Sequence, residues 1–272
     1  MTNLEKIILN IAENKTPCVF ISPHLDDAIF SAGGLILELL GKTSVTIATL
    51  FTKAGAPPYT QSAKMHLRHS GYAAASAEDL MSMRKQEDLR ACKIAGANFQ
   101  HLGFTDAMWR KKSRISLTGK IFGNIFPEIN HLYPFYKFNV ISGKPAKGDS
   151  DTMNGIKNSL ISLVGEIGQA VVFCPIGAGN HIDHIIARDV CAEIFPRTIF
   201  WTDFPYHINS KPDGHFISKM SLSPYGWSVN SQRKKDLILE YKTQVKDIAP
   251  LLNGNLDDVL KETFYIADNI NL

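Results

Sequence analysis

Apolar residues along the chain fall into two alternating kinds of segment. Short runs rich in β-branched residues are typical of buried strands in a parallel sheet. Such runs span residues 18–21, 45–51, 170–174 and 198–201. Longer stretches between and after them carry apolar residues at helical spacing, over residues 29–40, 80–95, 156–167, 184–194 and 232–248. This alternation predicts an α/β fold: a Rossmann-like, mostly parallel sheet with helices on both faces.

Two long segments interrupt the alternation. Residues 53–78 contain Gly55 and the pair Pro57-Pro58, and residues 127–152 are first aromatic and then rich in Gly, Lys, Pro and Asp. Loops of this length in a compact domain usually serve a function. We therefore expect a single α/β domain over residues 1–272 with loop insertions near 53–78 and 127–152, the first of them on the substrate side.

The composition narrows the class of protein. The chain has 272 residues, of which 44% are hydrophobic and 20% charged, as in ordinary globular domains. A net charge of +3 is too small to argue for a nucleic-acid partner. The longest apolar runs fall far short of the roughly 18 residues of a membrane span, and no secretory signal is visible. We expect a cytoplasmic protein without a nucleic-acid partner or a membrane span. The composition is compatible with a homo-oligomer.

The first candidate motif is Ser-Pro-His-Leu-Asp-Asp at residues 22–27, directly after the first predicted strand and before an apolar helix. Ligands of open parallel sheets bind beyond the carboxyl ends of the strands, where this motif is expected. One imidazole and two carboxylates suit zinc or a similar divalent ion. His24 and Asp27 can converge at a helix start, with Asp26 offset towards a metal-bound water. The alternative is that one aspartate only caps the helix.

The second candidate motif is Asn-His-Ile-Asp-His at residues 180–184, again between a predicted strand and a predicted helix. His181 and His184 are three residues apart, so both can face one cavity while performing different tasks. A third ligand from this motif would complete a zinc site with an open position. A lone His-x-x-His is usually a solvated helix start. Two such clusters at two strand ends favour a metal site.

These two blocks resemble those of the PIG-L/LmbE-like N-acetylglucosaminyl N-deacetylase family, whose members are zinc enzymes that remove acetyl groups from amino sugars. The Pro-His-x-Asp-Asp and His-x-Asp-His blocks of that family match residues 23–27 and 181–184. The wider form Ser-Pro-His-Leu-Asp-Asp-Ala, followed by Gly33-Gly34, is similar to one bacterial branch. Further matches at residues 84–96, 102–106 and 203–206 extend the resemblance over most of the chain.

The resemblance implies a role for each residue of the two blocks. It implies that His24, Asp27 and His184 hold the zinc ion, although another divalent metal such as Fe²⁺ would suit the same ligands. It also implies that Asp26 is the general base and that His181, in its protonated form, stabilises the oxyanion.

Three further residues are candidates for supporting or substrate contacts. Asp183 could hold His181 in one tautomer and favour its charged form, although it is also an adequate helix cap. Arg84 could bind sugar hydroxyls or a phosphate, or form a salt bridge with a neighbouring carboxylate. The resemblance favours Asp106 as an acceptor for a sugar hydroxyl.

The sequence departs from the family pattern at three positions. The commoner first block has Pro and Glu where this chain has Leu25 and Ala28, so a supporting hydrogen bond near the metal is lost. Some members place a Tyr at the position of Gly179. Any tyrosine that assists the oxyanion must therefore come from another part of this chain.

The expected function is that of a zinc-dependent amide hydrolase, an N-deacetylase acting on a small-molecule N-acetylated sugar or glycoconjugate through metal-activated water. A nucleotide-sugar glycosyltransferase is one alternative, because an Asp-Asp pair can hold a divalent ion on a diphosphate. That alternative leaves the histidines without a role. A catalytically inactive sugar-binding protein is another, against which the presence of Asp26 and His181 argues. A dinucleotide-binding enzyme would need a Gly-x-Gly-x-x-Gly motif after the first strand. Residues 22–27 do not contain it, which argues against that class of enzyme.

Overall fold

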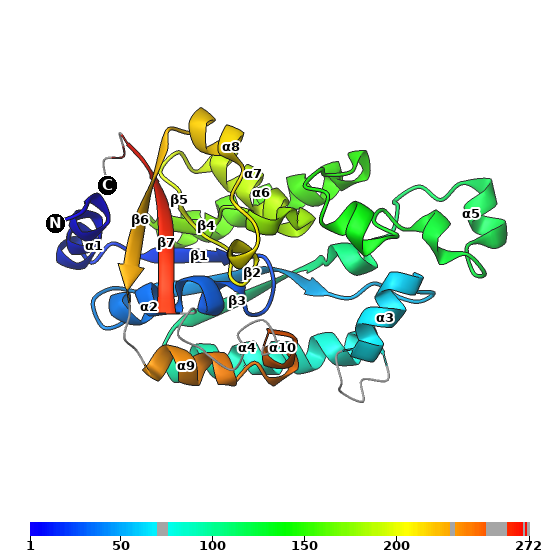
Figure 1. Ribbon diagram of the computed structural model, residues 1–272, viewed down its shortest axis with the longest axis horizontal. Coiled ribbons are helices and arrows are strands. Elements are labelled where there is room, and N and C mark those ends of the chain that lie inside the picture. Colours follow the sequence, from blue (N-terminus) through cyan, green and yellow to red (C-terminus); the bar gives the residue numbers. More distant parts are fainter. Residues whose placement is uncertain (70–75, 229–231, 249–259, 269, 271–272) are drawn as a thin grey trace.

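The computed structural model describes residues 1–69, 76–228, 232–248, 260–268 and 270. Its centre is a seven-stranded sheet with the order β3-β2-β1-β4-β5-β7-β6 (Figure 1). The strands are β1 (Cys18–Ser22), β2 (Val45–Lys53), β3 (Asn98–Thr105), β4 (Val171–Pro175), β5 (Ile199–Trp201), β6 (Leu222–Ser228) and β7 (Lys261–Ala267). Strands β1 to β5 are parallel, whereas β7 runs antiparallel to β5 and β6 antiparallel to β7.

The order of the parallel strands reverses at the middle of the sheet. The chain runs outwards from β1 to β2 and β3 and then returns to place β4 on the other side of β1. The register pairs Cys18 with Val171 and Phe20 with Phe173, so β1 and β4 end at the same edge. Open α/β sheets bind their ligands at this kind of reversal. Both candidate motifs follow these two strands.

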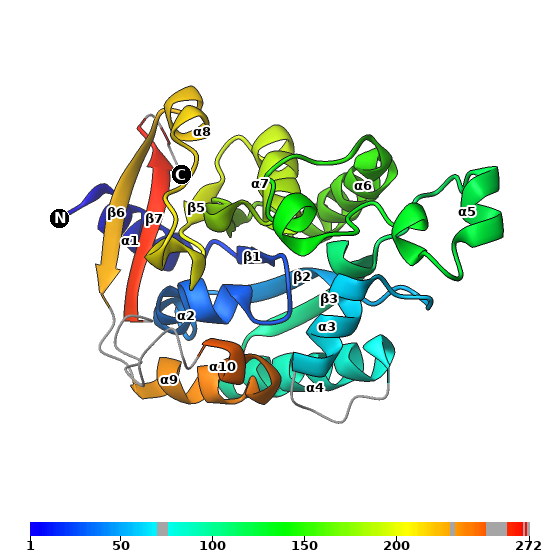
Figure 2. The same cartoon turned by 45° about the vertical axis from the view of Figure 1, so that its right-hand side comes forward.

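Helices cover both faces of the sheet (Figure 2). They are α1 (Asn3–Asn14), α2 (Asp27–Leu39), α3 (Gln61–His69), α4 (Ala77–Ala95), α5 (Leu117–Phe122), α6 (Ser150–Ile167), α7 (Ile182–Ile194), α8 (Gly214–Lys219), α9 (Gln232–Leu239) and α10 (Lys242–Ile248). Short helical turns η1 (Ala107–Trp109), η2 (Pro127–Asn130), η3 (Tyr136–Val140), η4 (Lys147–Asp149), η5 (Ala178–Asn180) and η6 (Tyr206–Ile208) connect them.

Strand β1 shows how the two cores form. Successive side chains of a strand point to opposite faces. Cys18 and Phe20 join the apolar cluster that includes α1, α2 and α4, whereas Val19 and Ile21 join the cluster that includes α6 and α7. Because both faces are buried, the strand is apolar throughout rather than alternating.

The α/β fold predicted from the sequence is confirmed, and each stretch with an apolar pattern contains a helix or a strand, although α1 and β3 lie outside those stretches. The helix expected over residues 232–248 is divided into α9 and α10. The antiparallel strands β6 and β7 were not predicted, because the chain after Pro205 showed no strand pattern. Insertion 127–152 consists of the turns η2, η3 and η4 and the beginning of α6.

The expectation of a loop over residues 53–78 is wrong for residues 61–69, which form α3. Thr60 explains where this helix starts, because its Oγ1 accepts a hydrogen bond of 3.1 Å from the backbone N–H of Ala63. Residues 70–75 of the expected loop lie outside the described residues.

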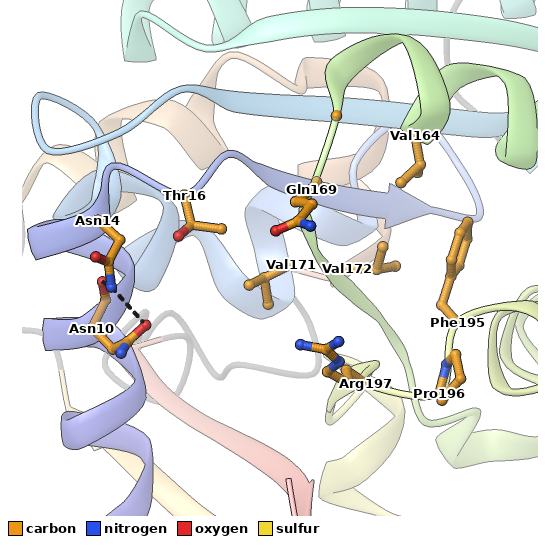
Figure 3. A pocket seen from close by; sticks show the side chains of 12 residues that line it. Asn10, Asn14, Thr16, Val164, Gln169, Val171, Val172, Phe195, Pro196 and Arg197 are labelled. Atoms are coloured by element: carbon orange, nitrogen blue, oxygen red, sulfur yellow. Dashed lines mark hydrogen bonds between the residues drawn. The ribbon is translucent and has the colours of Figure 1, made fainter. Parts of the chain in front are cut away.

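Within the described residues, no helix is both long and apolar enough to cross a bilayer. A cavity of about 480 Å³ lies at the amino-terminal ends of β1 and β4, lined by Asn10, Asn14, Gln169 and Arg197 among others (Figure 3). It lies at the opposite edge of the sheet from both candidate motifs and contains none of their residues.

Candidate metal and catalytic site

The turn after β1 is held by its own polar groups. Ser22 Oγ donates to the carbonyl of His24 at 2.6 Å and accepts from the N–H of Ala28 at 3.0 Å. Asp27 Oδ2 accepts from the N–H of His24 at 2.8 Å. These bonds place His24 and Asp27 side by side at the start of α2.

The turn after β4 reaches the same place from the other side. Gly177 and Gly179 adopt positive φ values of 81° and 82°, which glycine tolerates without strain. His181 then caps α7, and its Nδ1 accepts from the N–H of Asp183 at 3.3 Å. His184 follows within the first turn of the helix and is fully buried.

The two turns bring three donor atoms together. His24 Nδ1 lies 3.2 Å from Asp27 Oδ2 and 3.3 Å from His184 Nε2, and His184 Nε2 lies 3.3 Å from Asp27 Oδ2. In a tetrahedral zinc site with bonds of about 2.0–2.1 Å, neighbouring ligand atoms are separated by about 3.3–3.4 Å. The triangle of His24, Asp27 and His184 therefore has the size and the chemistry of three ligands to one divalent metal.

Each histidine of this triangle has a carboxylate at its other ring nitrogen. Asp183 Oδ2 lies 3.2 Å from His24 Nε2, and Asp203 Oδ1 lies 2.6 Å from His184 Nδ1. Metal-binding histidines usually have such a partner, which fixes the ring and its tautomer. This arrangement leaves Nδ1 of His24 and Nε2 of His184 to face the triangle.

Two wider groups of potential ligands overlap with the triangle. One joins His24, His181 and His184, and the other joins His24, Asp106 and Asp183, with ligand atoms within 4.8 Å of one another. The triangle with Asp27 is tighter than either. His181 Nδ1 is already an acceptor for a backbone N–H, and Asp183 already contacts His24. The distances therefore favour Asp27 as the third ligand.

Asp26 lines the pocket beside the triangle and is half-buried. It occupies the N-cap position of α2, but its side chain makes no capping hydrogen bond. Burial and the nearby Asp27 raise the pKa of Asp26 to about 7, although the charge of Arg84 opposes the increase. No hydrogen-bond partner occupies this carboxylate among the residues that the structure describes, so it is free to accept a proton from a bound molecule.

His181 differs from the expectation of a charged imidazole. Burial and the neighbouring His24 and His184 hold the pKa of His181 well below its usual range. Because Nδ1 accepts from the N–H of Asp183, the proton of the neutral ring belongs on Nε2. Asp183 contacts His181 through its backbone N–H rather than through its carboxylate, and the ring is not held in the charged form that was expected.

The carboxylate of Asp183 belongs to a buried network that the sequence did not reveal. Its Oδ2 accepts from the N–H of Ala107 at 2.8 Å, and Oδ1 accepts a short hydrogen bond from Arg110. Arg110 also donates to Asp149 at 2.7 Å. Asp149 comes from the insertion at 127–152, so this segment is tied to His24 through two carboxylates and one guanidinium. No local sequence pattern around Arg110 or Asp149 indicates this network.

The pocket at this edge has a volume of about 350 Å³ and contains the expected substrate residues Arg84 and Asp106. No salt bridge of Arg84 is present within the described part of the chain, and its buried Nε lacks a hydrogen-bond partner. Asp106 Oδ1 caps η1 by accepting from the N–H of Met108 at 2.7 Å, and its Oδ2 lies 3.7 Å from His24 Nε2. His66 also lines the pocket, and it belongs to the segment 53–78 that was expected on the substrate side.

Tyr206 occupies the space that Gly179 leaves open. A Cβ atom at Gly179 would lie 2.7 Å from Cβ of Tyr206, which is too close for any side chain. The Tyr206 ring lines the pocket, with its centroid 5.4 Å from that of His184 and 6.4 Å from that of His181. Tyr206 of η6 therefore lies in the space that a side chain at position 179 would need.

Known proteins are similar to this chain in sequence and in fold. A 2'-N-acetylparomamine deacetylase of Streptomyces fradiae is 27% identical over 194 residues, which are 69% of this chain but only 57% of that relative. A protein of the same name from Niallia circulans is 24% identical over 252 residues, covering 86% of this chain and 82% of the relative.

Solved structures show the same fold. The zinc-inhibited form of teicoplanin deacetylase superposes with a TM-score of 0.71 at 20% identity, covering 94% of this chain and all of the other (100%). A deacetylase of the A40926 pseudoaglycone gives a TM-score of 0.67 at 24% identity, covering 93% and 96% of the two chains. The family model described as "PIG-L: GlcNAc-PI de-N-acetylase" matches residues 19–195, which span both motifs and more than half of the chain. The chain belongs to the PIG-L family.

Proposed function

We propose that this protein is a divalent-metal-dependent amide hydrolase that removes an N-acetyl group from an amino sugar or a glycosylated small molecule. The observation that carries the proposal is the triangle of His24, Asp27 and His184 next to the unpartnered carboxylate of Asp26. The names of the relatives, which are deacetylases of amino-sugar compounds, support the same reaction.

The donor set favours zinc. Two imidazoles and one carboxylate are common zinc ligands, and the same set also suits Fe²⁺. When bound, such a metal acts as a Lewis acid and makes water acidic enough to attack at neutral pH. The remaining chemistry belongs to side chains of the protein.

Asp26 is proposed as the general base. In amide hydrolysis, the oxygen of water forms a bond to the acetyl carbonyl carbon while the water gives up a proton. Asp26 accepts that proton and then returns it to the leaving nitrogen as the C–N bond breaks, which yields acetate and a free amine. A positioned base contributes about 10²–10⁴ in rate.

His181 and Tyr206 are proposed as donors to the oxyanion. The acetyl oxygen gains negative charge as the carbonyl carbon becomes tetrahedral. His181 in its neutral form donates through Nε2–H, which does not require the protonated ring that the sequence suggested. Burial raises the pKa of Tyr206 well above 10, so its hydroxyl keeps its proton. One donor of this kind is typically worth about 10²–10³ in rate.

Arg84 and Asp106 are proposed to hold the sugar. Arg84 lines the pocket and forms no salt bridge within the described residues, so its guanidinium is available to bind hydroxyl or phosphate oxygens. Asp106 retains Oδ2 as an acceptor for a sugar hydroxyl while Oδ1 caps η1. Asp183 acts by positioning His24 and His181 rather than by touching substrate.

Neither alternative function gains support from the site. A nucleotide-sugar glycosyltransferase would use Asp26 and Asp27 together on a diphosphate, but Asp27 is turned towards two histidines and Asp26 is not part of that triangle. An inactive sugar-binding protein would not need an unpartnered carboxylate next to a complete set of metal ligands.

The test is acetate release from a panel of N-acetylated amino sugars, including nucleotide-linked and glycoside forms. The protein is assayed after chelation and dialysis, and again after addition of Zn²⁺ or Fe²⁺. We expect acetate only in the presence of metal and only with N-acetylated members of the panel. Metal-independent release, or no release from any member by metal-loaded protein, would contradict the proposal.

A further inference from the structure

A second cavity opens next to the candidate site. It has a volume of about 460 Å³, and its lining comes from α3, η1, and η3 with the residue before it. Met65, Met108, Phe135 and Phe138 provide its apolar surface. We call this cavity the apolar chamber.

The apolar chamber adjoins the candidate site. His66, Met108 and Tyr136 line both cavities. A ligand next to Asp26 and an occupant of the chamber would therefore contact the same three side chains.

The chamber leaves large apolar side chains uncovered. Met65 is 48% exposed, Phe135 52% and Phe138 79%. Contiguous apolar surface at the edge of a pocket usually marks a place where a ligand or partner binds. An occupant that covers these side chains removes apolar area from water, which is favourable.

Two hydrogen bonds hold α3 in place, one from η2, which lies outside the chamber lining, and one from η3, which lines the chamber. The N–H of Gln61 at the start of α3 donates to Glu128 at 2.8 Å, and the N–H of Tyr136 donates to Ser62 Oγ at 3.4 Å. α3 and η3 are therefore joined at one end of the chamber. The cavity between them is formed without a ligand.

The charge of the lining restricts the occupant. Lys137 contributes a positive charge, and none of the described lining residues carries a carboxylate. Burial and nearby positive groups lower the pKa of His66 to about 4, so this histidine is neutral at pH 7. A polycationic group would find no counter-charge here, whereas an uncharged hydrocarbon or aryl group fits the lining.

We propose that the apolar chamber binds an apolar aglycone attached to the amino sugar on which the enzyme acts. This inference rests on the proposed deacetylase function. The N-acyl chain is not the occupant, because it begins at the reacting carbonyl carbon. None of His24, Asp27 and His184, which surround that carbon in the proposed site, lines the chamber. The chamber adjoins the site at His66, Met108 and Tyr136 instead.

The test compares octyl and methyl N-acetyl-β-glucosaminide in two assays. Calorimetry measures binding, and acetate release measures hydrolysis by the metal-loaded enzyme. We expect the octyl glycoside to bind about tenfold or more tightly than the methyl glycoside, because its methylene groups leave water. The double variant Met65→Ser, Phe138→Ser should lose this preference through weaker binding and a higher KM for the octyl glycoside alone. Both residues are exposed, so the fold is not at risk.

Phe126→Ser is the matched control, because Phe126 is 57% exposed but lies outside the chamber. It should leave the preference unchanged. The proposal would be overturned if wild type bound the two glycosides equally. It would also be overturned if the double variant and the control lost the preference for the octyl glycoside to the same extent. N-octanoylglucosamine is a further probe. If the double variant binds it more weakly than wild type does but binds the octyl glycoside as wild type does, the chamber holds the acyl chain and the proposal is overturned. An octyl preference in binding without hydrolysis of either glycoside would contradict the proposed function alone.

Discussion

Asp203 Oδ1 lies 2.6 Å from Nδ1 of His184, on the ring nitrogen opposite the one that faces Asp27. Asp203 itself is fixed, since its Oδ2 accepts from the N–H of Ala178 at 2.8 Å in the turn after β4. The chain thus uses a residue after β5 to orient His184, the metal ligand proposed on α7. The same carboxylate makes His184 a stronger electron donor to a metal.

This contact predicts the effect of Asp203→Asn on metal affinity. The amide keeps the shape but loses the charge, so we expect the dissociation constant for Zn²⁺ to rise about 10–100-fold. Competition with a chromogenic chelator measures it. Asp213→Asn is the control, because Asp213 is half-exposed and 3.8 Å from Arg188. Identical zinc affinity in both variants would show that Asp203 does not support a metal ligand.

The pH profile tests the assignment of Asp26. Burial and Asp27 raise the pKa of Asp26 to about 7 in the metal-free protein, and a bound dication favours the carboxylate and lowers it. A base works when deprotonated, so the rate should rise with pH through an apparent pKa below 7. Arg84 favours the carboxylate, and Arg84→Gln should therefore move this limb to higher pH. Arg90→Gln should not move it. A limb that stays in place in Arg84→Gln belongs to another group.

Tyr206→Phe tests the proposed second donor to the oxyanion. Removal of the hydroxyl should lower kcat by about 10² while metal content stays the same. KM should change little, because the interaction forms mainly as charge develops on oxygen. Tyr225→Phe, a change on β6 far from the pocket lining, serves as the control. Full activity in Tyr206→Phe would show that Tyr206 does not donate a hydrogen bond to the oxyanion.

The anchoring of α2 predicts a large effect on stability. Glu262 on β7 accepts from Lys234 at 2.6 Å and from the N–H groups of Gly34 and Leu35 at 2.6 and 3.0 Å, in a fully buried position. Glu262→Gln should lower the free energy of unfolding by about 3–5 kcal/mol, because it breaks a buried ion pair.

Urea denaturation of the metal-free protein measures this change. Glu240→Gln breaks the more exposed pair with Arg90 at 3.5 Å and should cost no more than about 1 kcal/mol. Equal losses in the two variants would contradict the role given to Glu262.

The sequence was sufficient for the parallel strands β1, β2, β4 and β5 and for the composition of the site. The strands β1 and β4 are buried on both faces, so their apolar runs were readable, and a motif directly after a parallel strand has only one edge to occupy. The short spacing within each motif also limited which side chains could meet. His24, Asp27 and His184 were therefore within reach of prediction, and the structure places them together.

Contacts between distant segments could not be read in this way. Arg110 and Asp149 lie far apart from Asp183 in sequence, and no local pattern indicates that a guanidinium will join two buried carboxylates. Helix α3 and the antiparallel strands were missed because polar residues mask their periodicity. The charge of His181 depends on burial and on two neighbouring imidazoles, which only the three-dimensional arrangement reveals.

The most direct test of the account is to measure zinc content and acetate release in the same preparations of Asp26→Asn and Asp27→Asn. Asp26 is proposed as the base and Asp27 as a ligand, so the two neighbouring changes should have different effects. We expect Asp26→Asn to keep one zinc per chain while its rate falls by about 10² or more. Asp27→Asn should lose the metal and its activity together. If Asp26→Asn loses zinc as readily as Asp27→Asn, or keeps both metal and full activity, the proposed site is wrong.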